Sequence, residues 1–148
     1  MITNSSEESQ KEAFDLAKAI GDLAPINHAV VLALEGDLGS GKTTFLKGLA
    51  EGLGVKEKIL SPSFVVFKRF NLTEGRFKNF YHFDCYRLKS INDLKPLGID
   101  EILADPNNIV ALEWSSVVTD TLPSDAIVIK FEFIDETKRK IEILNIKK

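Results

Sequence analysis

The segment at residues 36–43 constrains this chain more than any other. It reads Gly-Asp-Leu-Gly-Ser-Gly-Lys-Thr and fits the pattern G-x-x-x-x-G-K-[ST] at every fixed position. The aliphatic run at 29–34 before it lacks polar alternation, which is typical of a strand buried on both faces. After it, apolar residues recur at helical intervals and stop at Gly54. The sequence therefore predicts a strand, a glycine loop and a helix, the setting in which this motif binds phosphate.

Each residue type in the loop has a chemical reason. Glycines let backbone N–H groups turn around phosphate oxygens, and the N-terminus of the following helix adds partial positive charge. We expect Lys42 to reach the β- and γ-phosphates of a nucleotide and the Thr43 hydroxyl to ligate Mg²⁺. The nucleotide contacts predicted from the loop are Asp37, Gly39, Ser40, Gly41, Lys42, Thr43 and Thr44.

The remaining segments predict an α/β fold. Ser9 and Glu12 have the spacing of a capping box, and residues 10–20 predict a helix that Gly21 ends. Segments 64–70 and 76–84 are rich in Phe, Val and Tyr and predict an antiparallel hairpin after the phosphate-loop helix. Further strands are expected at 109–112, 127–133 and 141–146, with short helical pieces at 91–94 and 97–103 that Pro96 interrupts. We expect one domain over residues 1–148, with a mixed sheet of about seven strands covered by helices.

Composition excludes several classes of protein. Among 148 residues, 19 are Lys or Arg and 22 are Asp or Glu, so a net charge of −3 disfavours nucleic-acid binding by charge alone. A single cysteine excludes a disulfide framework and a multi-cysteine zinc site. The longest aliphatic run has six residues, and the first residues lack the pattern of a signal peptide. We therefore expect a cytoplasmic protein without a membrane segment.

Other motifs narrow the kind of nucleotide protein. The guanine-specificity string Asn-Lys-x-Asp and the string Asp-x-x-Gly are absent, so a Ras-like GTPase is not expected. The chain has four scattered arginines, at positions 69, 76, 87 and 139, rather than the arginine-rich lid of a small-molecule kinase. Hydrolysis also needs carboxylates near Mg²⁺ and the attacking water. Asp84 and Glu113 each end a predicted strand and are the candidates.

Four motifs in register resemble the TsaE (YjeE) family. They are Gly-Asp-Leu-Gly-Ser-Gly-Lys-Thr-Thr-Phe at 36–45, Ser-Pro-Ser-Phe at 61–64, His-Phe-Asp-Cys-Tyr-Arg-Leu at 82–88 and Leu-Glu-Trp at 112–114. The resemblance implies a P-loop NTPase-like, three-layer fold and a cytoplasmic, Mg²⁺-dependent ATPase. It also implies a role, with TsaB and TsaD, in placing threonylcarbamoyl on the tRNA adenosine next to the anticodon. Contact with tRNA would then be indirect, through the complex.

The resemblance also implies roles for individual residues. Thr43, Asp84 and Glu113 would serve the metal, and Lys42, Asp84 and Glu113 would serve catalysis. Adenine would lie near residues 6–9, with Ser9 among its contacts. The nucleotide-responsive switch loop would be Ser61, Pro62, Ser63 and Phe64. Two departures from the family pattern are Ser63, where threonine is usual, and Ser115-Ser116, where Pro-Glu often follows the tryptophan.

Several alternatives stay open at this point. The chain could be a nucleotide-gated binding module without essential hydrolysis, or a kinase for a small metabolite. The cations Lys68, Arg69, Arg76 and Lys78 could meet tRNA or an acidic partner, or form a solvated edge. His82 could contact the switch loop or be a hydrogen-bonded structural histidine. We also expect Arg69, Arg76 and Arg139 to lie away from the phosphate loop, which predicts slow hydrolysis by the chain alone.

Overall fold

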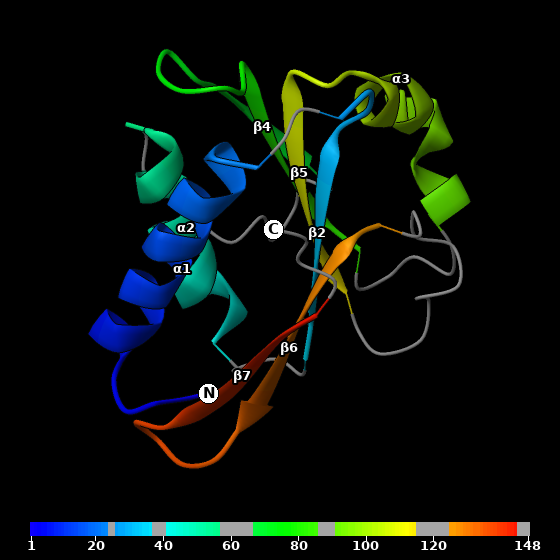
Figure 1. Ribbon diagram of the computed structural model, residues 1–148. Helices are drawn as coiled ribbons and strands as arrows, with labels where there is room; N and C mark the ends of the chain where they lie inside the picture. The colour runs from blue at the N-terminus through cyan, green and yellow to red at the C-terminus, as the bar shows by residue number, and fades with distance from the viewer. Residues whose placement is uncertain (24–25, 37–40, 57–66, 86–90, 115–124, 145–148) are drawn as a thin grey trace.

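The computed structural model describes residues 1–23, 26–36, 41–56, 67–85, 91–114 and 125–144. One seven-stranded sheet has the order β1-β7-β6-β2-β5-β4-β3. Helices α1 and α2 cover one face, and the short helices η1 and α3 lie on the other (Figure 1), which confirms the three-layer α/β prediction. The elements are β1 Ile2–Thr3, α1 Ser6–Gly21, β2 Val30–Glu35, α2 Lys42–Leu53, β3 Phe67–Asn71, β4 Asn79–Asp84, η1 Ile91–Leu97, α3 Ile99–Ala104, β5 Asn108–Trp114, β6 Ile127–Phe133 and β7 Arg139–Leu144.

The aliphatic run before the glycine loop forms the central strand β2. It pairs in parallel with β5 on one side and with β6 on the other, and residues 30–34 are buried. Strand β4 runs parallel to β5, so β2, β5 and β4 end at the same edge of the sheet. Strands β3, β7 and β1 pair antiparallel at the margins. This arrangement brings the carboxyl ends of three parallel strands to the edge of the sheet where Gly36 follows β2.

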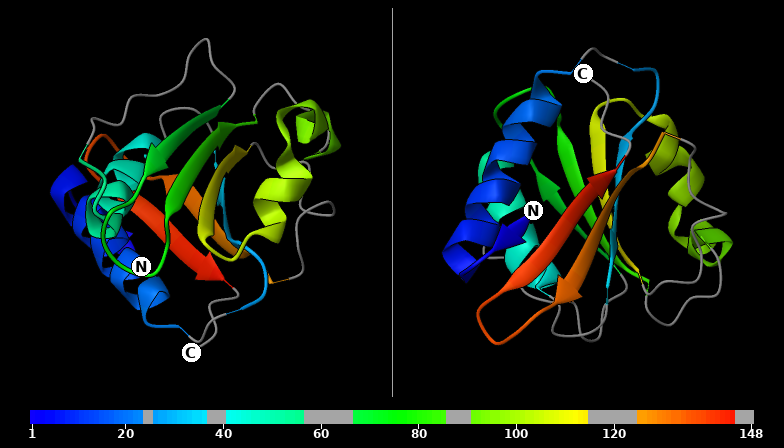
Figure 2. Two further views of the ribbon diagram at one scale, coloured as in Figure 1. Left: turned by 90° about the horizontal axis from the view of Figure 1, so that it is seen from above. Right: turned by 60° about the horizontal axis from the view of Figure 1, so that its bottom comes forward.

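Helices α1 and α2 lie side by side over one face of the sheet (Figure 2). Their backbones approach closely because α2 presents Gly48 and Gly52 to α1. A Cβ atom on Gly48 would lie 2.7 Å from the Cα atom of Gln10, and one on Gly52 would lie 2.7 Å from the Cβ atom of Ala17. Contacts this short exclude any larger side chain at positions 48 and 52 unless a helix moves.

The start of α1 differs from the prediction. The helix begins at Ser6, and the Ser5 hydroxyl accepts a 3.1 Å hydrogen bond from the Glu8 amide, so the cap lies one turn before the expected Ser9. The Ser9 hydroxyl instead pairs with the Thr3 hydroxyl at 2.7 Å. Both Ser5 and Ser9 have a glutamate three residues later, and the sequence alone does not choose between them. The short strand β1, which was not predicted, places Thr3 where it engages Ser9.

The structure also differs from the predictions for the short helices and the C-terminal strands. Pro96 lies inside η1 and does not interrupt the helical pieces, because its fixed φ fits 3₁₀ geometry. The break falls at Gly98, which has a left-handed φ of 81°. The predicted hairpin forms as β3 and β4, and β7 begins two residues before its expected start at 141. None of the described helices has the length and apolar character needed to cross a membrane.

Candidate nucleotide site

Helix α2 begins after a glycine N-cap, Gly41, which has no side chain to cap the first turn. Gly41 has a left-handed φ of 102° and stands at the N-cap, and the Phe45 amide closes the first turn on the Gly41 carbonyl at 3.0 Å. The N–H groups of residues 42–44 come before this bond and have no acceptor within the helix. By contrast, α1 has a serine cap. A glycine in place of a capping side chain leaves the start of α2 suited to an anion.

Lys42 connects the start of α2 with the end of β2. The residue is 4% exposed, and its ammonium group donates a hydrogen bond to the Gly36 carbonyl just after β2. The side chain thus reaches from the start of α2 back to the end of β2. Asp37, Gly39 and Ser40 lie outside the described residues. The ammonium group therefore lies at the Gly36 carbonyl, where the motif at 36–43 begins.

The two candidate carboxylates meet at the ends of β4 and β5. Asp84 and Glu113 are direct register partners in the parallel pair, and the Cys85 amide extends the pairing by donating to the Glu113 carbonyl at 2.9 Å. Because side chains alternate along a strand, Glu113 shares the face of Ile109 and Ala111, which belong to the core beneath α1 and α2. Asp84 shares that face by the same alternation. Both acids therefore lie on the side of the sheet where the phosphate-loop helix packs.

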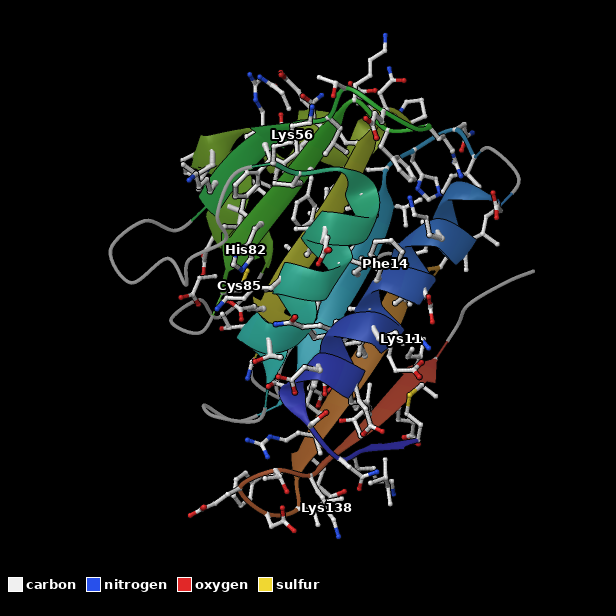
Figure 3. All side chains as sticks on the ribbon, turned by 90° about the vertical axis from the view of Figure 1, so that its left-hand side faces the viewer. Lys11, Phe14, Lys56, His82, Cys85 and Lys138 are labelled. Atoms are coloured by element: carbon white, nitrogen blue, oxygen red, sulfur yellow. The ribbon has the colours of Figure 1, made fainter. Side chains whose placement is uncertain are left out.

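A buried histidine holds one of these acids. The Nε2 atom of His82 lies 2.9 Å from the Oε2 atom of Glu113, and the two side chains are 2% and 4% exposed. Ala111 is opposite His82 in the register, so the imidazole crosses diagonally past a small side chain to reach Glu113. Figure 3 shows His82 and Cys85 near the carboxyl end of β4. Of the two roles left open by the sequence, the structure supports the hydrogen-bonded one, and its partner is a candidate site residue.

A cavity of about 240 Å³ adjoins the start of α2. It lies where the N-terminal ends of α1 and α2 meet the β6–β7 turn, at the lower edge of the sheet in Figure 1. The predicted contacts Ser9, Gly41 and Thr44 all line it. The full lining is Ser5, Ser6, Glu7, Ser9, Gly41, Thr44, Glu136, Thr137 and Arg139.

The prediction that Arg139 lies away from the phosphate loop was wrong. A Cβ atom on Gly41 would lie 3.5 Å from the Cγ atom of Arg139, so the arginine side chain contacts the end of the loop. Its Nη1 atom donates to the carbonyls of Asp135 and Lys138 at 2.5 and 2.9 Å, and its guanidinium stacks on Phe133. The sequence missed this contact because β7 pairs with β6 and places Arg139 on the helix side of the sheet.

Arg76 has a different structural role. Its Nη1 atom donates to the carbonyls of Leu23 and Ile20 at 3.2 and 3.5 Å, where α1 ends. Its guanidinium also stacks on the Phe77 ring. A cation suits a helix C-terminus, where carbonyl groups lack intrahelical partners. One of the four hairpin cations is thus engaged by α1 and is not a freely solvated charge.

Some of the other residues discussed above lie outside the described parts of the chain. The switch loop Ser61, Pro62, Ser63 and Phe64 lies outside the described residues, as does Arg87. Cys85 is described and buried, and burial together with the nearby Asp84 and Glu113 raises the pKa of its thiol to about 12. Within the described chain, no group of three or more His, Cys, Asp or Glu side chains could hold a metal ion by itself.

Comparisons with known proteins agree with this geometry. The sequence model described as "Threonylcarbamoyl adenosine biosynthesis protein TsaE" matches residues 6–141. A tRNA threonylcarbamoyladenosine biosynthesis protein TsaE of Bacillus subtilis is 38% identical over 75% of this chain and 66% of its own length. The corresponding proteins of Borreliella burgdorferi and Rickettsia felis are 37% and 34% identical, over 80% and 97% of this chain and 82% and 78% of their own lengths. The crystal structure of YdiB from Bacillus subtilis is similar with a TM-score of 0.73 and 32% identity, covering 97% of this chain and 82% of that one. On these matches, and with β2 and α2 on either side of the glycine motif, the chain belongs to the TsaE family.

Proposed function

We propose that this protein is the Mg²⁺-dependent, ATP-hydrolysing subunit that supports threonylcarbamoyl modification of the tRNA adenosine next to the anticodon. The observation that carries the proposal is the placement of Lys42 and the pair Asp84–Glu113. Lys42 reaches from the start of α2 to the Gly36 carbonyl after β2, and the two carboxylates end adjacent parallel strands on the face where α2 packs. Phosphoryl transfer to water needs a cation on the β- and γ-phosphates and acids beside the metal and the water.

Lys42 and the start of α2 would bind the phosphates. Lys42 is buried, and its ammonium group donates a hydrogen bond to the Gly36 carbonyl. An anionic phosphate oxygen is a stronger acceptor than this neutral carbonyl. The first-turn N–H groups of α2 supply further donors. ATP binding would therefore satisfy groups that the fold already gathers at the loop.

The donor set fits Mg²⁺. Asp84, Glu113 and the Thr43 hydroxyl offer hard oxygen ligands, and Mg²⁺ is usually held by one or two carboxylates together with substrate phosphates. Bound Mg²⁺ would neutralise charge that develops on the phosphates.

The two carboxylates would divide the remaining work. Glu113 is buried and has one oxygen fixed by His82, whereas Asp84 is half-buried at the end of β4. We assign Glu113 with Thr43 to holding the metal, and Asp84 to orienting the attacking water and accepting its proton. Because the strands end in register, the two acids would act on the same small volume.

The cavity beside Gly41 would take the nucleoside. It is continuous with the start of α2 and is lined by serine and threonine hydroxyls from both helices. Its position agrees with the adenine site that the family resemblance places near residues 6–9. Arg139 would form one wall of this pocket and support the end of the phosphate loop.

The partners proposed for this activity are TsaB and TsaD. The net charge of −3 gives the chain little general affinity for tRNA, so tRNA would be reached through the complex. The alternative, a nucleotide-gated binding module, would need Lys42 and Thr43 but neither Asp84 nor Glu113. The carboxylates therefore distinguish the two functions.

Two sets of variants test the proposal. Lys42→Ala should abolish tight ATP binding in calorimetry, since the lysine supplies the side-chain charge that the motif places on the β- and γ-phosphates. Asp84→Ala and Glu113→Ala should each lower turnover about a hundredfold or more while nucleotide affinity falls far less. Near-normal hydrolysis by both carboxylate variants would favour the binding module, and unchanged ATP affinity in Lys42→Ala would remove the phosphate-loop assignment.

A further inference from the structure

We propose that His82 is a positioning residue that fixes the Glu113 carboxylate for the metal. The inference rests on the proposed function, because it takes Glu113 as a metal-holding acid. It goes further by naming the residue that determines how this acid presents its two oxygens. His82 would touch neither nucleotide nor metal and would act only through Glu113.

The geometry of the pair carries the first step. The Nε2–H group of His82 donates to Oε2 of Glu113 over 2.9 Å, and both side chains are almost completely buried. A carboxylate has two equivalent oxygens and rotates about its last side-chain bond unless a partner selects one orientation. With Oε2 held by the imidazole, the orientation of the whole carboxylate, including Oε1, is fixed.

The strand register carries the second step. Asp84 is directly opposite Glu113, and His82 is opposite Ala111, two residues earlier along β5. The imidazole therefore reaches Glu113 from a position two residues before the ends of the strands. Asp84 lies beside Glu113 at the strand ends. His82 therefore approaches Glu113 from the middle of the strands, away from the edge where Gly36 follows β2.

Burial raises the cost of losing the hydrogen bond between His82 and Glu113. Removing one partner from a buried pair leaves the other polar group without compensation, which is costly in the interior. Groups that hydrogen-bond a metal-ligating side chain orient it, and their loss commonly costs ten- to a hundredfold in metal affinity or activity. A side chain at position 82 that cannot donate to Glu113 should therefore weaken the metal site without touching the phosphate loop.

Three substitutions separate positioning from packing. His82→Gln can place an amide N–H near the position of Nε2, whereas the shorter side chain of His82→Asn cannot reach Glu113. His82→Leu removes the donor altogether. The matched control is His28→Gln, because His28 lies before β2 and pairs with Asp125 at 2.8 Å, away from the proposed site. Glu113→Gln provides the reference for loss of the acid.

The readout is binding of Mn²⁺, a paramagnetic substitute for Mg²⁺, measured by electron paramagnetic resonance with a non-hydrolysable ATP analogue. His82→Asn and His82→Leu should weaken Mn²⁺ binding ten- to a hundredfold, with affinity for the metal-free analogue changed less than threefold. His82→Gln should recover most of the Mn²⁺ affinity, and His28→Gln should match the wild type. In the Glu113→Gln background, His82→Asn should cause no further loss.

The outcomes separate this inference from the proposed function. If Glu113→Gln leaves Mn²⁺ affinity unchanged, the assignment of Glu113 to the metal fails, and the positioning role fails with it. If Glu113→Gln weakens Mn²⁺ binding but His82→Asn and His82→Gln bind it like the wild type, only the inference about His82 is overturned. Additive losses in the double variant, or equal losses in His82→Gln and His82→Asn, would likewise overturn it.

Discussion

Replacing Gly48 by alanine should destabilise the protein through the contact between α1 and α2. A methyl group at position 48 would lie 2.7 Å from two backbone carbons of Gln10, and the Gln10 carbonyl oxygen would be closer still. Normal carbon–carbon contacts lie at about 3.5–4.0 Å, so one helix must move by about 1 Å. Neither backbone can relieve the overlap by changing a side-chain rotamer.

The magnitude follows from what the shift would loosen. Helix α1 buries Ala13, Leu16, Ala17 and Ile20, and a gap of about 0.5–1 Å forfeits a quarter to a half of each dispersion contact. Overpacking of this kind costs about 1–3 kcal/mol, and the rigid backbone places Gly48 at the upper end. Alanine regains about 1 kcal/mol in helix propensity. We therefore expect a net loss of about 2 kcal/mol in the free energy of unfolding.

Urea denaturation followed by circular dichroism measures this loss, and the melting temperature should fall by about 4–8 °C. The matched control is Gly21→Ala at the end of α1, where the new methyl group would have no described atom within 4 Å other than its chain neighbours and the backbone of its own helix. That variant should be as stable as the wild type or slightly more stable. Because both helices line the cavity at Gly41, Gly48→Ala should also weaken ATP binding. If Gly48→Ala unfolds at the wild-type urea concentration with an unchanged slope, the reasoning about helix contact is wrong.

Three further predictions concern the site and its support. Cys85, with a thiol pKa of about 12, should react with a disulfide reagent at pH 8 far more slowly in the native protein than in urea. In the native protein only about one thiol in ten thousand is ionised at that pH, and the thiolate is the reactive form. Equal rates in both states would contradict the burial of Cys85. Arg76→Leu should lower the free energy of unfolding by about 1–2 kcal/mol in urea titrations, because it removes donors to the end of α1. Arg69→Leu, at an exposed position of β3, should change it by less than about 0.5 kcal/mol, and the reverse order would refute the role of Arg76 at the end of α1. The chain alone should hydrolyse ATP below about 1 s⁻¹, and TsaB and TsaD should accelerate it. The reason is that Nη1 of Arg139 is bonded to two carbonyls of the β6–β7 turn, so this arginine does not supply positive charge to the transition state. Fast hydrolysis by the isolated chain that Arg139→Ala abolishes would show that Arg139 does supply that charge.

The sequence by itself determined the features that depend on neighbouring residues. The motif at 36–43, the aliphatic strand before it and the helix after it are local patterns, and the strand and the helix formed as predicted. The hairpin of β3 and β4 and the alternating strand β6 followed from spacing in the same way. Buried strands and amphipathic helices have different hydrophobic periods, which is why the α/β class could be inferred without coordinates.

Only the tertiary structure decided which distant residues meet. The sequence nominated Asp84 and Glu113 separately, but their pairing depends on the register between β4 and β5, which are joined by a long connection. The same register selects Glu113 as the partner of His82, and a shift by one residue would turn these side chains to the opposite face. The position of Arg139 against Gly41 likewise follows from strand pairing rather than from sequence distance. Local preferences specify each element, whereas long-range pairing brings the functional groups together, because the physical contacts involved link residues tens of positions apart.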